Sequence, residues 1–216
     1  GTGSGKSTLM LLLDKLYPLE EGCGRITIGG TDIRKIRTGH LRQNIGMVLQ
    51  EPYLFSRTIA ENIGITEDNM PMEEIRHAAQ IACVDDAITE FAKGYDTIVG
   101  ERGVTLSGGQ KQRTAIARML TQKAPIMVFD DSLSAVDSET DAKIRQALRK
   151  NLGDSTVILI SHRVTTLMQA EKIMVLDKGR IAEIGSHDEL MAKNGIYRKI
   201  YDLQFSLDET ETSETL

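Results

Sequence analysis

The feature that most restricts the fold is an alternation of short apolar runs with segments of helical spacing. The runs at residues 126–129 and 156–160 are almost wholly apolar, and each is followed by a segment with helical spacing. Nearly continuous apolar strands are typical of parallel sheets buried on both faces, and helices supply the crossovers that such sheets need. The sequence therefore predicts an α/β fold in which a largely parallel sheet is flanked by helices.

Other segments fill in this plan. Further strands are expected at residues 25–28 and 45–49, and a hairpin at 172–184 around Asp177, Lys178 and Gly179. Helices are expected at residues 6–17, 72–83, 85–92, 110–120, 138–148 and 165–170, with two short helices at the end.

The block from residue 54 to residue 120 holds several expected helices and no convincing strand. It predicts a helical subdomain inserted into the sheet domain. Residues 1–53 and 121–204 would form the core domain that contains the sheet. Residues 205–216 are polar and acidic, which predicts a disordered tail.

Composition excludes some classes of function. The formal net charge is −5, and the last nine residues hold four acidic and no basic side chains, so the rest of the chain carries −1. A nearly neutral body argues against nucleic-acid binding. The two cysteines, Cys23 and Cys83, form neither a disulfide framework nor a metal motif and fit a reducing compartment. No apolar run approaches the roughly 20 residues that span a bilayer.

The chain opens with GTGSGKST, which ends a phosphate-binding loop of the pattern GxxxxGK[ST]. Gly1, Thr2, Gly3 and Ser4 fill the variable positions, and the first glycine of the pattern falls one residue before the chain begins. We therefore expect the chain to be a piece of a longer polypeptide whose N-terminal strands lie upstream. Backbone N–H groups of such a loop turn toward phosphates. The alternative is a flexible glycine turn before an ordinary helix.

A second glycine-rich motif, LSGGQ, begins at Leu106 about a hundred residues later. Ser107 can cap the helix that follows, and bare glycine N–H groups at the helix start form a second anion site. Without the phosphate loop, an ordinary capped helix would explain it as well.

Together with this loop, LSGGQ resembles the signature motif of ATP-binding cassette (ABC) proteins. Other residues match that family in order. Gln50 is similar to the glutamine that binds Mg²⁺ and orders water, and Asp130, after the run IMVF, to the Walker B aspartate. Ser134-Ala135-Val136-Asp137 resembles the D-loop. His162 resembles the switch histidine that contacts the γ-phosphate, although a structural histidine is the alternative for that residue taken alone.

The resemblance covers roughly residues 1–204. It implies that residues 1–53 and 121–204 form an ATP-binding core of the kind found in P-loop nucleotide hydrolases, and it implies which residues contact ATP and Mg²⁺. Those expected to contact ATP are Gly1, Thr2, Gly3, Ser4, Gly5, Lys6, Ser7, Thr8, Ser107, Gly108, Gly109, Gln110 and Asp137. Ser7, Gln50 and Asp130 are expected to hold Mg²⁺, and Asp131, His162 and Gln50 to act in catalysis.

Two segments resemble exporter-type members of the family. VGERG, residues 99–103, is similar to their X-loop, and Tyr53-Leu54-Phe55 to their transmission segment. These three side chains are either core or a docking groove for a membrane-domain helix near Gln50–Phe55. The resemblance implies a cassette on the cytoplasmic face of a membrane, joined to a transmembrane domain of the same polypeptide, without nucleic acid as a partner.

The chain departs from the family pattern at Asp131, where the family usually has glutamate. Aspartate is one methylene shorter, which withdraws the base from the attacking water, and misplacement by about 1 Å can cost on the order of a hundredfold in rate. Binding of ATP should survive. The alternative is that Asp131 works from a slightly shifted backbone.

Because family cassettes dimerise head to tail, a weak site favours a heterodimer with a partner that carries glutamate, as in heterodimeric multidrug exporters. The alternatives are a symmetric ATPase in a homodimeric exporter and a soluble ABC ATPase or regulatory nucleotide-binding module.

Overall fold

The computed structural model describes residues 3–100, 103–132, 136–151, 153 and 155–213. It forms two compact units, Leu13–Ile160 and the pair of segments Gly1–Leu12 and Ser161–Leu216. Across the described ranges, none of the helices combines the length and apolar character that a membrane span requires.

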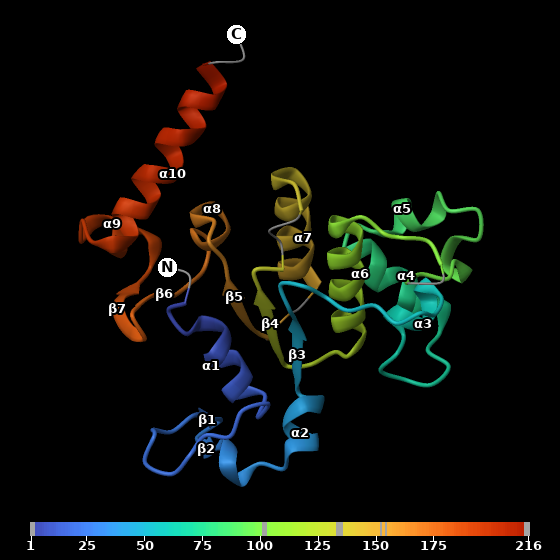
Figure 1. The fold of residues 1–216 in the computed structure, drawn as a ribbon, viewed down its shortest axis with the longest axis horizontal. Helices are drawn as coiled ribbons and strands as arrows, with labels where there is room; N and C mark the ends of the chain where they lie inside the picture. Colours follow the sequence, from blue (N-terminus) through green and yellow to red (C-terminus); the bar gives the residue numbers. More distant parts are fainter. Residues whose placement is uncertain (1–2, 101–102, 133–135, 152, 154, 214–216) are drawn as a thin grey trace. The chain divides into compact units, whose positions relative to one another are not determined.

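The larger unit is built on a parallel three-stranded sheet (Figure 1). The central strand β4 (Ile126–Asp130) pairs with β3 (Ile45–Val48) on one side and with β5 (Thr156–Ile160) on the other. Residues 127–130 of β4 are buried, as expected for a central strand. Helix α7 (Ser138–Asn151) connects β4 to β5. The predicted α/β fold with a parallel sheet and flanking helices is therefore confirmed.

A block of helices lies between β3 and β4 in the chain. It consists of α3 (Ile59–Ile63), α4 (Met72–Ile81), α5 (Asp85–Thr89), the short 3-10 helix η2 (Gly94–Asp96) and α6 (Gly108–Thr121). No strand occurs in this block apart from isolated bridges, as far as residues 54–100 and 103–120 are concerned. These helices share one apolar core with β3, β4 and α7.

Helix α6 lies directly on the sheet. It contacts β3 as well as α3 and α4 (Figure 1). The contact depends on Gly46, because a Cβ atom there would lie 2.7 Å from Cγ of Met119. The missing side chain lets the helix approach the strand closely, which ties α6 to the end of β3.

The N-terminal part of the larger unit contains small elements. The strands β1 (Thr27–Ile28) and β2 (Thr31–Asp32) form a hairpin, followed by a 3-10 helix η1 (Ile33–Lys35) and α2 (Thr38–Gln43). Gly29 and Gly30 both have positive φ angles, as the tight turn between the strands requires. The sequence analysis predicted the first strand but neither the second nor α2.

The smaller unit begins with most of α1 (Lys6–Leu13) and continues with α8 (Val164–Leu167). The predicted hairpin is present as β6 (Ile173–Asp177) and β7 (Arg180–Gly185), with Lys178 and Gly179 at φ angles of 46° and 74°. Helices α9 (His187–Ala192) and α10 (Ile196–Ser213) follow. Val164, Ile173, Leu190 and Tyr197 form the buried centre of this unit.

The last helix differs from the expectation of a disordered tail from residue 205, because α10 continues to Ser213. Its start is capped by Glu183, whose carboxylate accepts hydrogen bonds from the backbone N–H groups of Ile196 (2.7 Å) and Tyr197 (2.9 Å). The stacked rings of Tyr201 and Phe205, with centroids 4.3 Å apart, add an i,i+4 contact. A capped and packed first half lets the helix extend over polar residues that have no apolar pattern of their own.

Helix α1 ends at Leu13, four residues before the predicted end. Lys15 has a φ angle of 53°, which ends the helical path. The guanidinium of Arg42 donates to the backbone carbonyls of Asp14 (3.1 Å) and Lys15 (3.2 Å), and so satisfies groups that the helix leaves unpaired.

Candidate functional site

The phosphate loop has the backbone that its glycines predict. Gly3 and Gly5 have φ angles of 80° and 90°, which side-chain-bearing residues rarely adopt. Ser4 is buried, and Nζ of Lys6 donates to its Oγ at 3.2 Å. The first turn of α1 holds no acidic residue, so the positive potential at its start is not offset there. Gly1 and Thr2 lie outside the described residues.

Gln50 and Asp130 lie at the same end of the sheet, where two adjacent parallel strands finish. Val48 pairs with Phe129 in parallel register, so the residues that follow each strand leave at the same side. Asp130 is only 8% exposed and ends β4, whereas Gln50 is exposed two residues beyond β3. An amide oxygen and a carboxylate are the kind of ligand that Mg²⁺ accepts.

Asp131 has an unusual and anchored backbone. Its φ angle is 46°, a left-handed conformation in which aspartate is enriched among residues with a side chain. Its backbone N–H donates to the carbonyl of Ile160 on β5 at 2.8 Å. The side chain is half-buried. Because this bond continues the pairing of β4 with β5, the position of Asp131 is set by the sheet rather than by a free loop.

The signature motif starts α6 as expected. Ser107 is the N-cap, and its Oγ accepts from the N–H of Gln110 at 3.2 Å. In return, Oε1 of Gln110 accepts from the N–H of Ser107 at 2.9 Å, which completes a capping box. Gly108 is exposed and Gly109 half-exposed, so the start of the helix is open to a ligand. The prediction that Ser107 caps this helix is confirmed.

The remaining predicted residues are less fully defined. Asp137 is exposed, and its carboxylate accepts from the N–H of Thr140 in the first turn of α7 (2.9 Å), which lowers the pKa of this carboxyl. His162 is exposed, and its backbone carbonyl accepts from Nε2 of Gln204 at 2.6 Å. Ser134 and Ala135 of the predicted D-loop lie outside the described residues, as do Glu101 and Arg102 of VGERG.

An apolar patch surrounds the predicted transmission segment. Tyr53 is 70% and Phe55 41% exposed, and their rings meet edge to face with centroids 5.2 Å apart. Val99, the first residue of the predicted X-loop, lies close to this segment, because its N–H donates to the carbonyl of Arg57 at 2.9 Å. The start of the predicted X-loop and the predicted transmission segment are therefore neighbours. Leu54, in contrast, packs against the main core.

Three polar residues were missed by the sequence analysis. Asn62 and Gln112 are buried, and Arg118 is half-buried on α6; all three bond to backbone groups of residues 50–58. A signal for one of them exists, because Arg118 interrupts the otherwise apolar stretch AIARML within a helix. Its partners are 56 and 65 residues away in sequence and could not be identified from the pattern.

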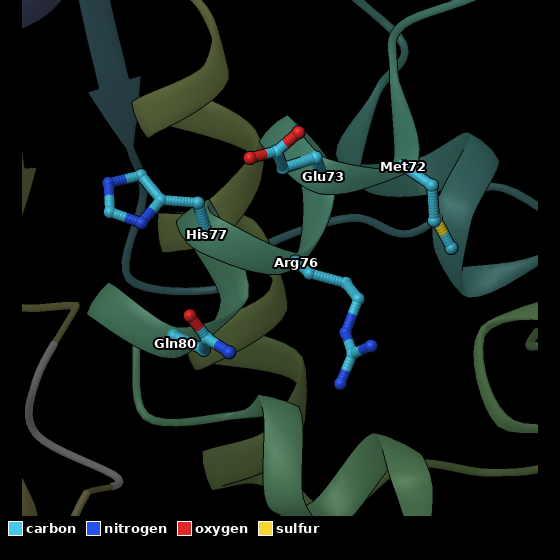
Figure 2. Close-up of a pocket in the computed structure, with 5 residues that line it drawn as sticks. All are labelled: Met72, Glu73, Arg76, His77 and Gln80. Carbon is cyan, nitrogen blue, oxygen red and sulfur yellow. The ribbon is translucent and has the colours of Figure 1, made fainter.

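A surface hollow of about 580 Å³ lies elsewhere, on the outer side of α4. It is lined by Met72, Glu73, Arg76, His77 and Gln80, and Figure 2 shows His77 and Arg76 directed to different sides of the helix. Nε of Arg76 lies 3.6 Å from Oδ1 of Asp85, as an ion pair. None of the predicted site residues lines this hollow, so it is separate from the nucleotide motifs.

Comparison with known proteins places this arrangement in a family. Residues 1–134, more than half of the chain, match the family model described as ABC transporter. The chain therefore belongs to the ABC transporter family.

Two curated relatives are named as a lipid flippase and as a toxin translocation protein. The chain is 42% identical over 205 residues to the ATP-dependent lipid A-core flippase of Vibrio parahaemolyticus, covering 94% of this chain and 35% of the flippase. It is 45% identical over 206 residues to the leukotoxin translocation ATP-binding protein LktB of Mannheimia haemolytica, covering 95% of this chain and 29% of LktB. The chain thus spans about a third of the length of these relatives.

A solved structure agrees with the fold. The structure of a bacterial Atm1-family ABC exporter with ATP bound matches with a TM-score of 0.90 and 42% identity, over 94% of this chain and 36% of that chain. This likeness confirms the predicted class of fold, an ABC-type ATPase fold with a parallel sheet and helices.

Proposed function

We propose that this chain is the nucleotide-binding domain of an exporter-type ABC transporter, in which it binds Mg²⁺-ATP and pairs with a second cassette. The observation that carries this proposal is the common sheet edge from which Gln50 and Asp130 leave adjacent parallel strands. The phosphate loop and the capped signature helix supply the two other motifs that such a site needs.

The residues present fit a magnesium ion. Asp130 and Gln50 offer a carboxylate and an amide oxygen, and Ser7 adds an exposed hydroxyl beside Lys6. Within the described ranges, no group of three or more His, Cys, Asp and Glu side chains is arranged to hold a metal. Mg²⁺ is usually held by one or two carboxylates together with substrate phosphates. When bound, Mg²⁺ would neutralise charge that develops on the transferred phosphoryl group.

The two glycine-rich motifs would contact ATP in different ways. Lys6 would donate to the β- and γ-phosphates, and the N–H groups of Gly3 to Thr8 would surround them. The hydroxyl of Ser107 already accepts from Gln110, which leaves its proton free for a phosphate oxygen of ATP bound to the partner cassette. Each ATP would then join one phosphate loop to the opposite signature helix.

The proposed weakness of this chain's own hydrolytic site rests on Asp131. General-base catalysis needs hydrogen-bond contact with the attacking water. The backbone N–H of Asp131 is fixed to Ile160, so a shift that restored the reach of a glutamate would break a bond of the sheet. The anchored backbone of Asp131 therefore favours an impaired site over a compensated one.

An impaired hydrolytic site on this chain favours a heterodimer, because the partner cassette can then supply the competent site. The site built on this chain's phosphate loop would hold ATP longer, and the site built on the partner's phosphate loop and this LSGGQ would carry most hydrolysis. His162 and Gln50 would position the γ-phosphate and the water in the weak site. Hydrolysis at the strong site would release the pair.

The patch of Tyr53 and Phe55 supplies the proposed contact with a transmembrane domain of the same polypeptide. Two exposed aromatic rings beside the VGERG segment suit an apolar helix end that docks on them. This contact would lie at the cytoplasmic face of a membrane. Closure of the two cassettes would move it and so drive export.

The test is steady-state Mg²⁺-ATPase of the full-length transporter with its natural partner. Asp131→Glu and Asp131→Asn are compared with the change of the partner's catalytic glutamate to glutamine. We expect the partner change to abolish turnover and Asp131→Asn to leave most of it.

Equal loss in Asp131→Asn and in the partner variant would show that Asp131 is a working base. That result would favour the second candidate, a symmetric ATPase. A partner identical in sequence to this chain would also contradict the heterodimer. Full ATPase without any transmembrane domain in the polypeptide would favour a soluble or regulatory cassette.

A further inference from the structure

Helix α6 is bonded to the segment that leads from Gln50 to Phe55 at two points. Near its start, Nε2 of the buried Gln112 donates to the backbone carbonyl of Gln50 at 3.1 Å. In its last turn, Nη1 of Arg118 donates to the carbonyl of Tyr53 at 2.8 Å. The helix that begins with the signature motif therefore holds both ends of this segment.

Arg118 is also bound to Asn62 on α3. Its Nε donates to the backbone carbonyl of Asn62 at 2.7 Å, and Nη2 donates to Oδ1 of the same residue at 2.8 Å. The guanidinium carbon lies 5.6 Å from the centre of the Phe55 ring. The five donors of arginine in a planar fork suit these simultaneous contacts, which a lysine ammonium cannot reproduce.

Asn62 in turn fixes the backbone of Phe55. It is 0% exposed, its Oδ1 accepts from the N–H of Phe55 and its Nδ2 donates to the carbonyl of Phe55, both at 2.9 Å. Nδ2 also donates to the carbonyl of Thr58 at 3.0 Å. Since Oδ1 faces donors and Nδ2 faces acceptors, only one orientation of the amide satisfies all of these groups.

These contacts form a stiff connection. An α-helix rises 1.5 Å per residue, so Ser107 and Arg118 stand about 16 Å apart on one rod. Burial lowers the pKa of Arg118, but an arginine remains protonated at neutral pH. A displacement of the signature end of α6 would thus reach Phe55 through Asn62, whose buried amide cannot lose its bonds without leaving polar groups unpaired.

We propose that Arg118 and Asn62 are positioning residues that couple the signature end of α6 to the aromatic patch of Tyr53 and Phe55. This inference rests on the proposed function, in which the signature contacts ATP and the patch contacts a transmembrane domain. It assigns the coupling to Arg118 and Asn62, which belong neither to the signature motif nor to the predicted transmission segment. A purely architectural role would instead let nucleotide binding reach the patch whether or not the pair is intact.

The test is amide hydrogen exchange in the full-length transporter with its partner, in wild type and in Arg118→Lys. The matched control is Arg42→Lys, because Arg42 also donates through Nε and Nη2 to backbone carbonyls, but to those of Asp14 and Lys15 and not to the segment of residues 53–58. Exchange is followed in peptides covering residues 53–58, 3–13 and 126–130, without nucleotide and with Mg²⁺-ATP under non-hydrolysing conditions.

Without nucleotide, Arg118→Lys is expected to speed exchange in residues 53–58 about tenfold or more, as a local opening that leaves β4 unchanged. Arg42→Lys should leave residues 53–58 at the wild-type rate. With Mg²⁺-ATP, the wild type should gain protection in both 3–13 and 53–58. Arg118→Lys should gain it in 3–13 only, with the KM for ATP unchanged and kcat lowered.

Unchanged exchange in residues 53–58 of Arg118→Lys, or an ATP response there equal to wild type, would overturn the coupling. If the wild type shows no protection of residues 3–13, the proposed ATP binding fails and the coupling to it fails too. If residues 3–13 respond but 53–58 do not, ATP binding stands and the coupling alone is wrong.

Should Arg118→Lys not fold, Asn62→Asp serves in its place. Aspartate keeps an acceptor for the N–H of Phe55 and for Arg118, but removes the donors to the carbonyls of Phe55 and Thr58. The same loss of ATP-dependent protection in residues 53–58 is expected, and its absence would contradict the proposal.

Discussion

Lys6 is the basic side chain of the phosphate loop, and its Nζ donates to Oγ of Ser4 in the bond described above. In Lys6→Ala we expect the affinity for Mg²⁺-ATP to fall by roughly 10–100-fold, because a hydrogen bond to a charged group contributes about 1.5–3 kcal/mol. Equilibrium binding of ATP to the full-length protein measures this. The control is Lys172→Ala, an exposed lysine in the same unit.

Asp131→Asn should bind ATP with the wild-type affinity in the same assay, since Asp131 is proposed to act on water and not on the phosphates. A loss in Asp131→Asn as large as that in Lys6→Ala would place Asp131 in binding rather than in hydrolysis.

At the scale of elements, the contact between α6 and β3 depends on the absence of a side chain at Gly46. In Gly46→Ala the new methyl group would press against Met119, so we expect the local stability of α6 and β3 to fall by about 1–3 kcal/mol. Hydrogen exchange of these two elements measures the change. Gly39→Ala on α2 is the control, because no atom lies within 4 Å of its added Cβ.

Gly39→Ala should be neutral or stabilising by about 0.5–1 kcal/mol, as expected for Gly to Ala within a helix. The combination of Gly46→Ala with Met119→Ala should cost less than the sum of the single changes, because the first substitution fills space that the second empties. Additive costs would show that the two residues are not in contact.

Some helices and strands could be predicted from the sequence, and others could not. The strand at residues 156–160 was predicted to the residue, and the hairpin around Lys178 and Gly179 was recognised, because local apolar pattern and turn chemistry specify them. Helix α2 and strand β2 were missed, since each is short and has no apolar period. The length of α10 depends on its N-terminal cap by Glu183, and the sequence around residue 205 contains no local pattern that predicts this cap.

The candidate motif residues were predicted from type and spacing, because phosphate binding demands glycine, lysine and hydroxyl side chains in a fixed order. The network around Asn62 was not, because its members come from segments more than 50 residues apart. Long-range hydrogen bonds of this kind follow from the packing of α3 on α6, which only the fold reveals.

At the scale of the whole molecule, the proposed heterodimer places the two ATP-contacting motifs of this chain in different ATP sites. The phosphate loop belongs to the weak site, and LSGGQ belongs to the strong site. Gly109→Asp places a negative charge in the first turn of α6, where it favours the helix but repels phosphates. In the full-length heterodimer we expect this change to lower ATPase turnover by about a hundredfold, as when a group that stabilises transition-state charge is lost. Asp131→Asn should leave most of the turnover.

Gly109→Ala is the control for the added side chain, and it should keep most of the turnover. If Gly109→Asp and Asp131→Asn reduced turnover equally, the two sites would be equivalent and the asymmetric arrangement would be wrong. Steady-state ATPase on purified, reconstituted protein gives all three values.

The contact of Arg118 with the Phe55 ring has a pharmacological consequence. Phe55 is exposed at the surface, and the guanidinium beside its ring is held by Asn62 and by the carbonyl of Tyr53. A small molecule that bound between this ring and the guanidinium would loosen the proposed link between nucleotide and transmembrane domain without competing with ATP. In the proposed exporter such a compound would act as an uncoupler, and cellular ATP concentration would not reduce its potency.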